Sequence, residues 1–494
     1  MKRVRIAYVG VFDLKNYGDH LFPLIFKHEM TKRKLDFELI LFSNYDYQQN
    51  FESNYKIHSV GRLDEIHQET PIDFVIIGGG EIIHPHAFKQ KLEIDGVESE
   101  VDYEMLDIWM KPILFCEEKN IPCVLNGVGV PFELGSEPII ADLFDICTYI
   151  SVRNEASKQF LLNTGVNKEI LQIPDVAFLV SSVYAPRELK NARERLGLKE
   201  KYIVFQCGKG LPAEAKDTLK DVLKKEQAKG YEVVFLPLSY TNQDDVFLNE
   251  LAREFNLSIK TFPRTLHVEE IAAVLAGCSY YIGLSFHGAI TAASYGVMPI
   301  LFDYHDQVKT QNLYDYMNIP ELRATTPEEL YDILERQDKV DKQIVSGRVK
   351  EIQNEITQHF NTLYNIIVDY DCENISKDTS KDICSYKESY IRTLFRLKGL
   401  QLQNREIERM LSCYGLELNN KKFELEETQK VIAEQKRLIE DYKMDLRNKL
   451  ELLAKVKNDM KNVQDERDAL EQFRQEVIHS KSFRLLHMFD GNKE

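Results

Sequence analysis

Short runs of apolar residues alternate, along the first two thirds of the chain, with longer segments in which apolar residues recur at helical spacing. Before residue 180 the apolar runs are Val4–Val9, Phe37–Phe42, Phe74–Ile77, Pro122–Gly127, Tyr149–Val152 and Glu169–Ile173. Beyond residue 200 the strongest runs are Tyr202–Gln206, Glu232–Pro237, Tyr280–Leu284 and Met298–Phe302. Continuous apolar runs are typical of parallel strands covered on both faces. Their alternation with helices predicts an α/β fold.

The two sets of strands predict two doubly wound, Rossmann-like domains, over residues 1–185 and 186–367. The charged stretch Ala185–Leu198 is either the connection between them or a helix close to it. Ligands of such sheets bind beyond the carboxyl ends of the strands. The expected functional site is therefore a cleft between the two domains.

The pattern changes over residues 391–480, where apolar residues recur every seven positions. One series is Leu411, Leu418, Leu425, Ile432, Ile439, Leu446, Leu453 and Met460. A companion series, three residues out of phase, is Ile407, Tyr414, Tyr442, Val456, Val463, Leu470 and Val477. This spacing predicts an α-helical coiled coil. Because an unpaired seam would face water, we expect a homo-oligomer in preference to a single solvated helix.

Polar segments flank the coiled-coil pattern. Residues 368–390 are polar and predict a linker. In the last segment, 481–494, apolar residues such as Phe483 and Leu486 lie beside basic residues such as Lys481 and Arg484. This amphipathic tail either folds back on the coil or docks as a peripheral contact at the inner face of a membrane.

Composition narrows the class of protein. A chain of 494 residues is too long for one ordinary hydrophobic core. Its content of 44% hydrophobic and 29% charged residues is typical of a globular protein. Its formal net charge of -16 argues against a general nucleic-acid binder. No window of about 20 apolar residues predicts a membrane span. The eight cysteines form no CxxC pair, so we expect reduced thiols in the cytoplasm.

Polar or glycine-rich loops follow several predicted strands. Asn16 and Asp19 follow the first strand, and Asp19 is placed either as a helix cap alone or as a contact for a hydroxyl-rich ligand. Gly79 and Gly80 follow a later strand directly, where glycines let backbone N–H groups approach a ligand. "LNGVGVPFE" repeats the arrangement with Gly127 and Gly129.

Two nucleotide-binding patterns are missing from these loops, and so is a metal site. The chain has neither the GxGxxG dinucleotide fingerprint nor a GxxxxGK[ST] loop. Nicotinamide and ATP chemistry are therefore disfavoured. His84 and His86 form an HxH pair without further obvious ligands, so we expect no metal.

Arg153 ends a predicted strand in "YISVRNEAS" and stands at the beginning of a helix. A guanidinium beside free helix N–H groups is suited to a carboxylate or a phosphate. The alternative is an ion pair, for which Asp175 in "IPDVAFLV" is the candidate partner.

The segment "YIGLSFHGAITAASYGVMPI" places His287 between a strand and a helix of small residues. Ser285 and Gly288 flank it, and the helix N–H groups would point at whatever the histidine touches. Such a histidine either transfers a proton near neutral pH or is a satisfied structural residue. Lys309, in the segment after the next strand, either adds a second positive charge to the cleft or is simply exposed.

Taken together these segments resemble the polysaccharide pyruvyl transferase family. The resemblance rests on the order "NYGDHLF", "VIIGGGEII", "LNGVGV", "ISVRNEAS", "PDVAF", "GLSFHGAITAASYGVMPI" and "YHDQVK", over roughly residues 4–320. Many members have Arg-Leu-His where this chain has Ser285-Phe286-His287, although a serine-containing version also occurs in the family.

The resemblance implies a GT-B-like arrangement of the two domains and phosphoenolpyruvate as donor substrate, with no cofactor. The acceptor would be a pair of sugar hydroxyls on an exopolysaccharide, a cell-wall glycan or a lipid-linked precursor, and the product a pyruvate ketal. It implies that Arg153 and Lys309 contact the donor anion and that His287 is the acid. The residues implied to line the cleft are Asn16, Asp19, Gly79, Gly80, Gly127, Gly129, Asp175, Ser285 and Gly288.

Two other functions fit the same sequence features. A GT-B glycosyltransferase would use the cleft for a nucleotide sugar, because a glycine loop and a helix N-terminus also suit a diphosphate. A non-catalytic scaffold derived from such a transferase would use the coiled coil alone.

Overall fold

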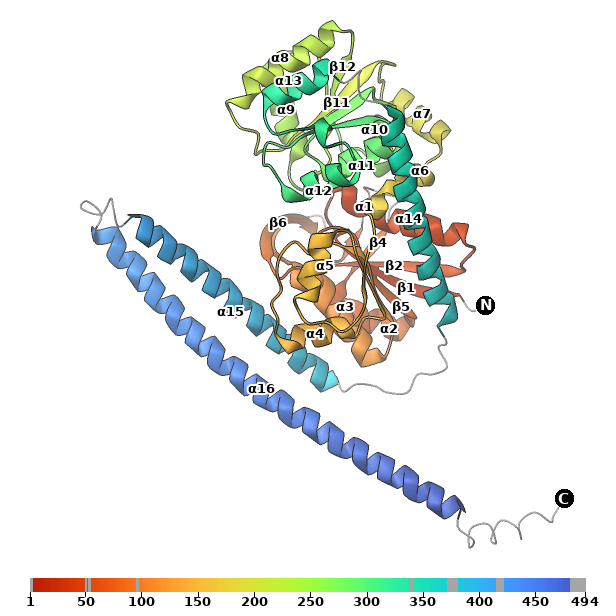
Figure 1. Cartoon of the computed structure of the whole chain (residues 1–494), viewed down its shortest axis with the longest axis vertical. Coiled ribbons are helices and arrows are strands. Elements are labelled where there is room, and N and C mark those ends of the chain that lie inside the picture. Colours follow the sequence, from red (N-terminus) through yellow and green to blue (C-terminus); the bar gives the residue numbers. More distant parts are fainter. Residues whose placement is uncertain are drawn as a thin grey trace, which may run out of the picture. The chain divides into compact units, whose positions relative to one another are not determined.

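The computed structural model describes residues 3–48, 51, 55–94, 97–336, 342–370, 381–414 and 422–479. The chain forms two compact units, Met1–Asp378 and Thr379–Glu494. The first contains both α/β domains and the second contains the C-terminal helices (Figure 1). Within the described residues, no helix is both long and apolar enough to cross a membrane.

The N-terminal domain is built on an eight-stranded sheet. Its strands are β1 (Val4–Val9), β2 (Phe37–Ser43), β3 (Tyr47–Gln48), β4 (Lys56–Ser59), β5 (Phe74–Gly78), β8 (Cys123–Val128), β9 (Tyr149–Val152) and β10 (Ile170–Gln172). They are arranged in the order β10-β9-β8-β5-β1-β2-β4-β3, and only β3 runs antiparallel to its neighbour. The main helices are α1 (Tyr17–Lys32), α2 (Leu63–Glu69), α3 (Met105–Lys119), α4 (Pro138–Asp145) and α5 (Glu155–Leu162).

A two-stranded antiparallel hairpin, β6 (Ala87–Ile94) and β7 (Val97–Glu104), is inserted between β5 and α3. The ring of Phe88, on β6, stacks on that of Tyr103, on β7, with 5.2 Å between the centroids. The sequence pattern did not predict this hairpin.

The C-terminal domain is built on a six-stranded parallel sheet, in the order β13-β12-β11-β14-β15-β16. Its strands are β11 (Tyr202–Gln206), β12 (Glu232–Phe235), β13 (Ile259–Lys260), β14 (Tyr280–Gly283), β15 (Met298–Phe302) and β16 (Arg323–Ala324). Its helices are α8 (Ala215–Ala228), α9 (Asp244–Phe255), α10 (Val268–Gly277), α11 (Phe286–Ser294), α12 (Val308–Tyr316) and α13 (Pro327–Arg336). Two parallel-sheet α/β domains are thus present, in a GT-B-like arrangement, and the predicted fold class is confirmed.

The connection between the sheets is helical. It comprises a 3-10 turn (Val176–Leu179), α6 (Val180–Val183) and α7 (Pro186–Arg195). The charged stretch Ala185–Leu198 is therefore part of the connection and is helical over Pro186–Arg195.

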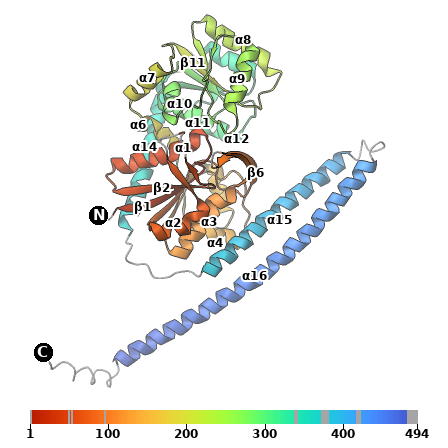
Figure 2. The same cartoon turned by 180° about the vertical axis from the view of Figure 1, so that it is seen from behind.

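Helix α14 (Lys342–Asp369) returns from the C-terminal domain to the N-terminal domain (Figure 2). The Gln353 side-chain amide donates a hydrogen bond to the Phe178 carbonyl at 2.9 Å. His359 bonds the Asn126 side chain at 2.7 Å and the Tyr149 hydroxyl at 2.9 Å, both on the N-terminal sheet. Residues assigned by sequence to the second domain therefore complete the packing of the first.

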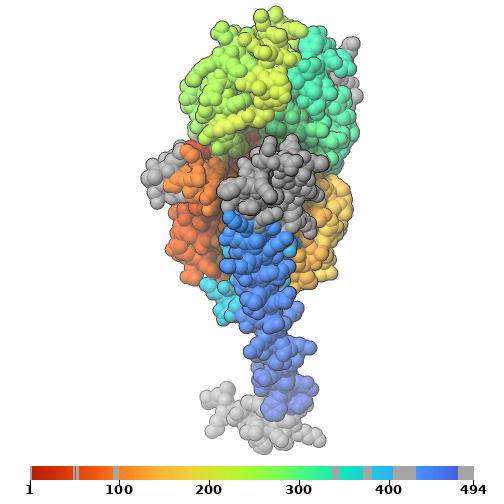
Figure 3. Space-filling model, turned by 90° about the vertical axis from the view of Figure 1, so that its left-hand side faces the viewer, coloured from red at the N-terminus to blue at the C-terminus, as the bar shows by residue number. Residues whose placement is uncertain are grey.

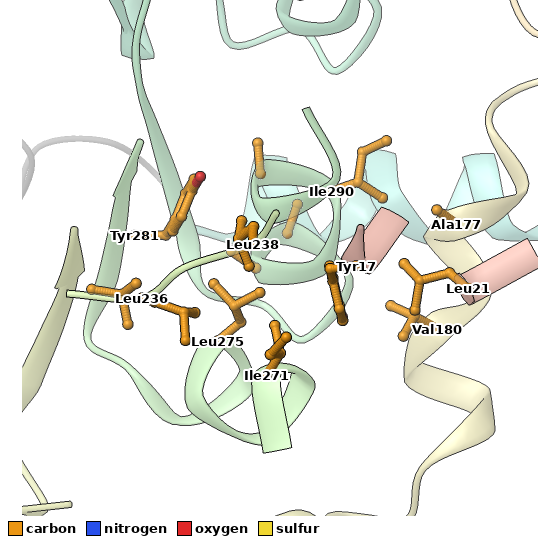
Figure 4. Packing of buried hydrophobic residues seen from close by; sticks show 14 of the residues in the cluster. Tyr17, Leu21, Ala177, Val180, Leu236, Leu238, Ile271, Leu275, Tyr281 and Ile290 are labelled. Carbon is orange, nitrogen blue, oxygen red and sulfur yellow. The ribbon is translucent and has the colours of Figure 1, made fainter. Parts of the chain in front are cut away.

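Apolar side chains from both domains share one continuous core. Tyr17 and Leu21 of α1 lie beside Val180, Ile271 and Ile290 from the later part of the chain (Figure 4). All five side chains are fully buried. In a space-filling view the two α/β domains form separate lobes of this unit (Figure 3).

The strand order of each sheet reverses beside its first strand, between β1 and β5 and between β11 and β14. Such switch points are where open α/β sheets bind ligands, because the loops diverge there and leave a crevice. Next to the switch points, the loop after β1 meets the loop after β12 across the domain boundary. The Tyr17 N–H donates to the Leu238 carbonyl at 2.9 Å, and the Tyr240 N–H donates to the Lys15 carbonyl at 2.9 Å.

The second unit contains two helices, α15 (Lys381–Tyr414) and α16 (Lys422–His479), which run antiparallel and pack on each other (Figures 1 and 2). The Lys449 ammonium of α16 donates to the Thr393 hydroxyl of α15 at 3.1 Å. The predicted helices are therefore present, as a pair in one chain. The linker predicted over 368–390 is helical at both ends, because α14 reaches Asp369 and α15 begins at Lys381. The predicted tail, 481–494, lies outside the described residues.

Candidate functional site

A cavity of about 570 Å³ lies between the two α/β domains, where the two switch points face each other. Loops after β1, β5, β9, β11, β12 and β14 line it, together with part of β6 and the beginning of α12. The cavity is lined by these predicted site residues: Asn16, Asp19, Gly80, Arg153, Ser285, His287 and Lys309. The structure therefore brings together residues from five separate segments of the sequence.

His287 lies in the first turn of α11, directly after β14. Its ring packs edge-on against Phe22 of α1, with the centroids 5.6 Å apart. The backbone of Gly18 covers another side, so closely that a Cβ there would lie 1.9 Å from the His287 Nδ1. The third neighbour is Asp175, whose Oδ2 lies 3.7 Å from Nε2. The imidazole is thus held in one orientation and keeps 14% of its side-chain surface exposed.

Arg153 follows β9 and is almost completely buried, with 4% of its side chain exposed. Its guanidinium lies 5.0 Å from the centre of the Phe286 ring and 3.4 Å from Asp175. Burial raises the pKa of Asp175, but His287 and Arg153 lower it by more, so the pKa stays below the usual value of an aspartate. Asp175 therefore remains ionised and holds the Arg153 guanidinium and the His287 imidazole in place.

Glu81 is a site residue that the sequence analysis missed. It follows the triple glycine after β5, and its two carboxylate oxygens bind different cations. Oε1 lies 2.9 Å from the Arg153 guanidinium, and Oε2 accepts a hydrogen bond from the Lys309 ammonium at 3.2 Å. The pair with Lys309 joins the two domains. Only the folded structure reveals it, because Lys309 follows Glu81 by 228 residues.

Asn16 and Asp19 lie at the beginning of α1. Asn16 is the N-cap by position, but its side chain caps no N–H and instead donates to the Asp19 carboxylate at 2.7 Å. Desolvation raises the pKa of Asp19 to about 6, although His287 and the Asn16 hydrogen bond oppose the rise. Asp19 is therefore a carboxyl group able to exchange a proton near neutral pH.

The predicted glycines divide into one that lines the cavity and others that support it. Gly80 lines the cavity, with φ of 62°. A Cβ on Gly129 would lie 2.9 Å from both the Arg153 Nε and the Gly80 carbonyl oxygen, so its absence lets the two loops touch. Gly79 packs against Phe22, and Gly127 lies near Ile173.

Ser285 and Gly288 form the N-terminal cap of α11. The Gly288 N–H donates to the Ser285 hydroxyl at 3.2 Å, as expected of a serine at this position. The sequence analysis expected free N–H groups at this helix terminus, but one of them is occupied by the cap. Gly288 also packs tightly against Tyr281, so it supports the cavity without lining it.

A second cavity, of about 530 Å³, reaches Arg153, Phe286 and Lys309 from another side. Asp175 lines this second cavity and not the first. The cationic side chains of Arg153 and Lys309 therefore lie between two cavities, and both cavities are large enough for small polar ligands.

A family model described as polysaccharide pyruvyl transferase matches residues 16–306, more than half of the chain. No curated protein matches the sequence. Among solved structures, the UDP-GlcNAc 2-epimerase of Neisseria meningitidis bound to UDP-GlcNAc is 8% identical, with a TM-score of 0.49, over 74% of this chain and 100% of that one.

Two further solved structures show the same level of similarity. The UDP-GlcNAc 2-epimerase of Methanocaldococcus jannaschii is 13% identical, with a TM-score of 0.48, over 73% of this chain and 99% of that one. MnaA of S. aureus, solved with UDP, is 10% identical, with a TM-score of 0.46, over 77% of this chain and 99% of that one. Similarity this low carries no argument about activity.

Proposed function

The chain belongs to the polysaccharide pyruvyl transferase family, and from this premise we propose that it transfers the pyruvyl group of phosphoenolpyruvate to two sugar hydroxyls. The product is a pyruvate ketal on an exopolysaccharide, a cell-wall glycan or a lipid-linked precursor. The proposal rests above all on one observation. At the cavity the buried guanidinium of Arg153 and the ammonium of Lys309 are bridged by a carboxylate, so their spacing suits an anion.

The donor carries a carboxylate and a phosphate, and the cluster offers complementary charge. Arg153 gives the bidentate geometry that suits a carboxylate or phosphate, and Lys309 gives a mobile second charge. Fixed by Asp175 and Phe286, Arg153 is preorganised and stabilises charge at little reorganisation cost.

His287 is the candidate acid in this reaction. It delivers a proton to the methylene carbon of phosphoenolpyruvate while the oxygen of an acceptor hydroxyl bonds to the adjacent carbon and the hydroxyl proton passes to a base. The second hydroxyl then displaces the phosphate at that carbon, and its proton leaves with the phosphate. Gly18, Phe22 and Asp175 hold the imidazole, and the resulting orientation favours such a transfer.

We also propose a cytoplasmic location, where the donor and a lipid-linked acceptor would meet. Six cysteines, Cys116, Cys123, Cys147, Cys207, Cys278 and Cys384, are buried thiols that form no disulfide, which is compatible with a reducing compartment. The proposed acceptor partner is a glycan or a lipid-linked oligosaccharide, and no cofactor takes part.

The first test is donor binding followed by detection of the product. Phosphoenolpyruvate should raise the melting temperature of the protein, whereas a panel of nucleotide sugars should not. Incubation with labelled phosphoenolpyruvate and candidate lipid-linked oligosaccharides should add a carboxyethylidene group, visible by mass spectrometry. Stabilisation by a nucleotide sugar alone would favour a glycosyltransferase, and stabilisation by neither class would favour a scaffold.

A His287→Gln variant tests the role of the acid. It should bind phosphoenolpyruvate and keep the wild-type melting temperature, but turnover should fall by about 100-fold or more, the usual scale of general acid catalysis. Undiminished turnover in a normally folded variant would remove His287 from the mechanism.

A further inference from the structure

Glu81 occupies the position where the proposed function places the donor anion. Its carboxylate binds Arg153 at 2.9 Å and Lys309 at 3.2 Å, and the three side chains form one cluster facing the larger cavity. A donor anion that uses these two cations must therefore compete with Glu81. The side chain is free to move, because 30% of its surface is exposed and both of its ion-pair partners are side chains.

We propose that Glu81 holds the donor site in the ligand-free protein and that, once the donor displaces it, Glu81 is the base that accepts the proton of the first acceptor hydroxyl. This inference rests on the proposed function. As the hydroxyl oxygen bonds to the donor carbon, its O–H bond breaks and the proton passes to the Glu81 carboxylate. The methylene carbon receives a different proton, from His287, so protons and charge balance.

Glu81 becomes a stronger base when it loses its contacts with Arg153 and Lys309. Burial raises the pKa of Glu81, but Arg153 and Lys309 lower it by more, so the pKa lies below the usual value while both cations are bound. A donor anion that neutralises both cations removes this effect, and the proton affinity of Glu81 then rises. His84, in the same loop, is a further ionisable side chain that interacts with Glu81.

Three other carboxylates near the cluster are less suited to this step. Asp244, which also lines the larger cavity, accepts hydrogen bonds from the backbone N–H groups of Leu238 and Ser239. Asp175 lies on the second cavity, remains paired with Arg153 and His287, and accepts a hydrogen bond from the Ala177 N–H at 2.9 Å. Asp19 is held by Asn16 and touches neither Arg153 nor Lys309 through a hydrogen bond or ion pair among the described contacts. Only Glu81 is released by the same event that loads the donor.

The Glu81→Gln variant separates this role from a structural one. Loss of the competing charge should tighten phosphoenolpyruvate binding at least threefold by calorimetry, while kcat falls by about 100-fold or more. The fall of kcat toward low pH, which reports the base in the loaded enzyme, should disappear. Glu81→Asp should recover part of the turnover, because it restores a carboxylate. Glu133→Gln is the matched control, since it removes an exposed carboxylate of the same domain, and it should match the wild type.

Each outcome decides a separate question. If Glu81→Gln weakens donor binding, Glu81 is a brace for Arg153 and the inference is wrong. If kcat is unchanged, Glu81 is not the base. Melting temperatures of both variants check that they fold. If the wild-type protein binds no phosphoenolpyruvate, the proposed function itself fails, and the assignment of Glu81 fails with it.

Discussion

His287 owes its orientation to the absence of a side chain at Gly18. The first turn of α1 presents bare backbone to the imidazole, and Phe22, one turn later, supplies the ring that packs edge-on against it. The residues that position the candidate acid therefore come from the other domain. Helix α1, which was predicted to contact a ligand, therefore also supports the His287 ring.

A Gly18→Ala variant should show this dependence. The added Cβ would lie 1.9 Å from the His287 Nδ1 and 2.5 Å from its Cγ, so the ring must turn away from Asp175. We expect kcat to fall at least tenfold. Unfolding free energy should change little, because alanine is favoured over glycine in a helix by about 1 kcal/mol, which offsets part of the strain.

Steady-state kinetics and chemical denaturation measure the two quantities. Gly61→Ala is the control, because its Cβ would meet nothing closer than 3.4 Å. Wild-type turnover in Gly18→Ala would mean that the imidazole works equally well in another orientation.

At the scale of elements, the buried parallel strands were predictable and the exposed ones were not. The predicted runs Val4–Val9 and Met298–Phe302 coincide with β1 and β15, because strands covered on both faces are apolar throughout. The hairpin β6–β7 was missed because its residues are mostly charged or polar, with no long apolar run. Short edge strands such as β13 and β16 carry too few residues for a pattern.

The candidate site was predictable in part for the same reason. Arg153, His287 and Lys309 follow strands or strand-loop junctions, and the chain order alone places such residues at one edge of a sheet. Glu81 was missed because its importance depends on two partners that only the folding of both domains brings to it. Ser285 was predicted to line the cleft and does line the cavity, but its role as the cap of α11 was not predicted.

Helix α14 gives the fold a dependence on pH. Burial lowers the pKa of His359 to about 3, against a usual value of about 6.5 in an unfolded chain. The neutral imidazole is therefore compatible with the fold above pH 6.5. As the pH falls from 6.5 toward 3, this histidine removes about 1.4 kcal/mol of stability per pH unit.

Denaturation at pH 7 and pH 5.5 should reveal the effect as a loss of unfolding free energy in the wild type. A His359→Gln variant should lose less between the two pH values, because glutamine binds no proton. His86→Gln, at an exposed position, should lose as much as the wild type. Equal losses in all three proteins would assign the acid sensitivity to other groups, such as the buried His20.

At the scale of the whole molecule, α16 offers more apolar surface than α15 covers. Ile432 and Ile439 of the predicted seam are buried, whereas Val463, Leu470 and Phe473 are each more than 60% exposed. Contiguous exposed apolar side chains on a helix favour a partner. We propose that the C-terminal helices self-associate through this part of the seam.

Deletion of residues 381–494 should therefore convert an oligomer, most simply a dimer, into a monomer. Residues 1–378 form a compact unit, so the shortened protein should keep its fold. Light scattering on both proteins measures the mass, and a Leu470→Glu, Phe473→Glu pair in the full chain tests the seam itself. A mass per chain that does not change on deletion would show that the α/β domains associate by themselves.

The return of α14 to the N-terminal domain means that the two domains are not interchangeable parts. A fragment of residues 1–185 lacks α14, which supplies the hydrogen-bond partners of Phe178, Asn126 and Tyr149. This fragment should therefore aggregate when it is expressed alone. Co-expressed with residues 186–378, it should assemble into a complex that elutes as one species. This dependence on α14 limits how the domains can be exchanged, both in evolution and in protein engineering. A recombination event that exchanges either domain must therefore also carry a matching α14.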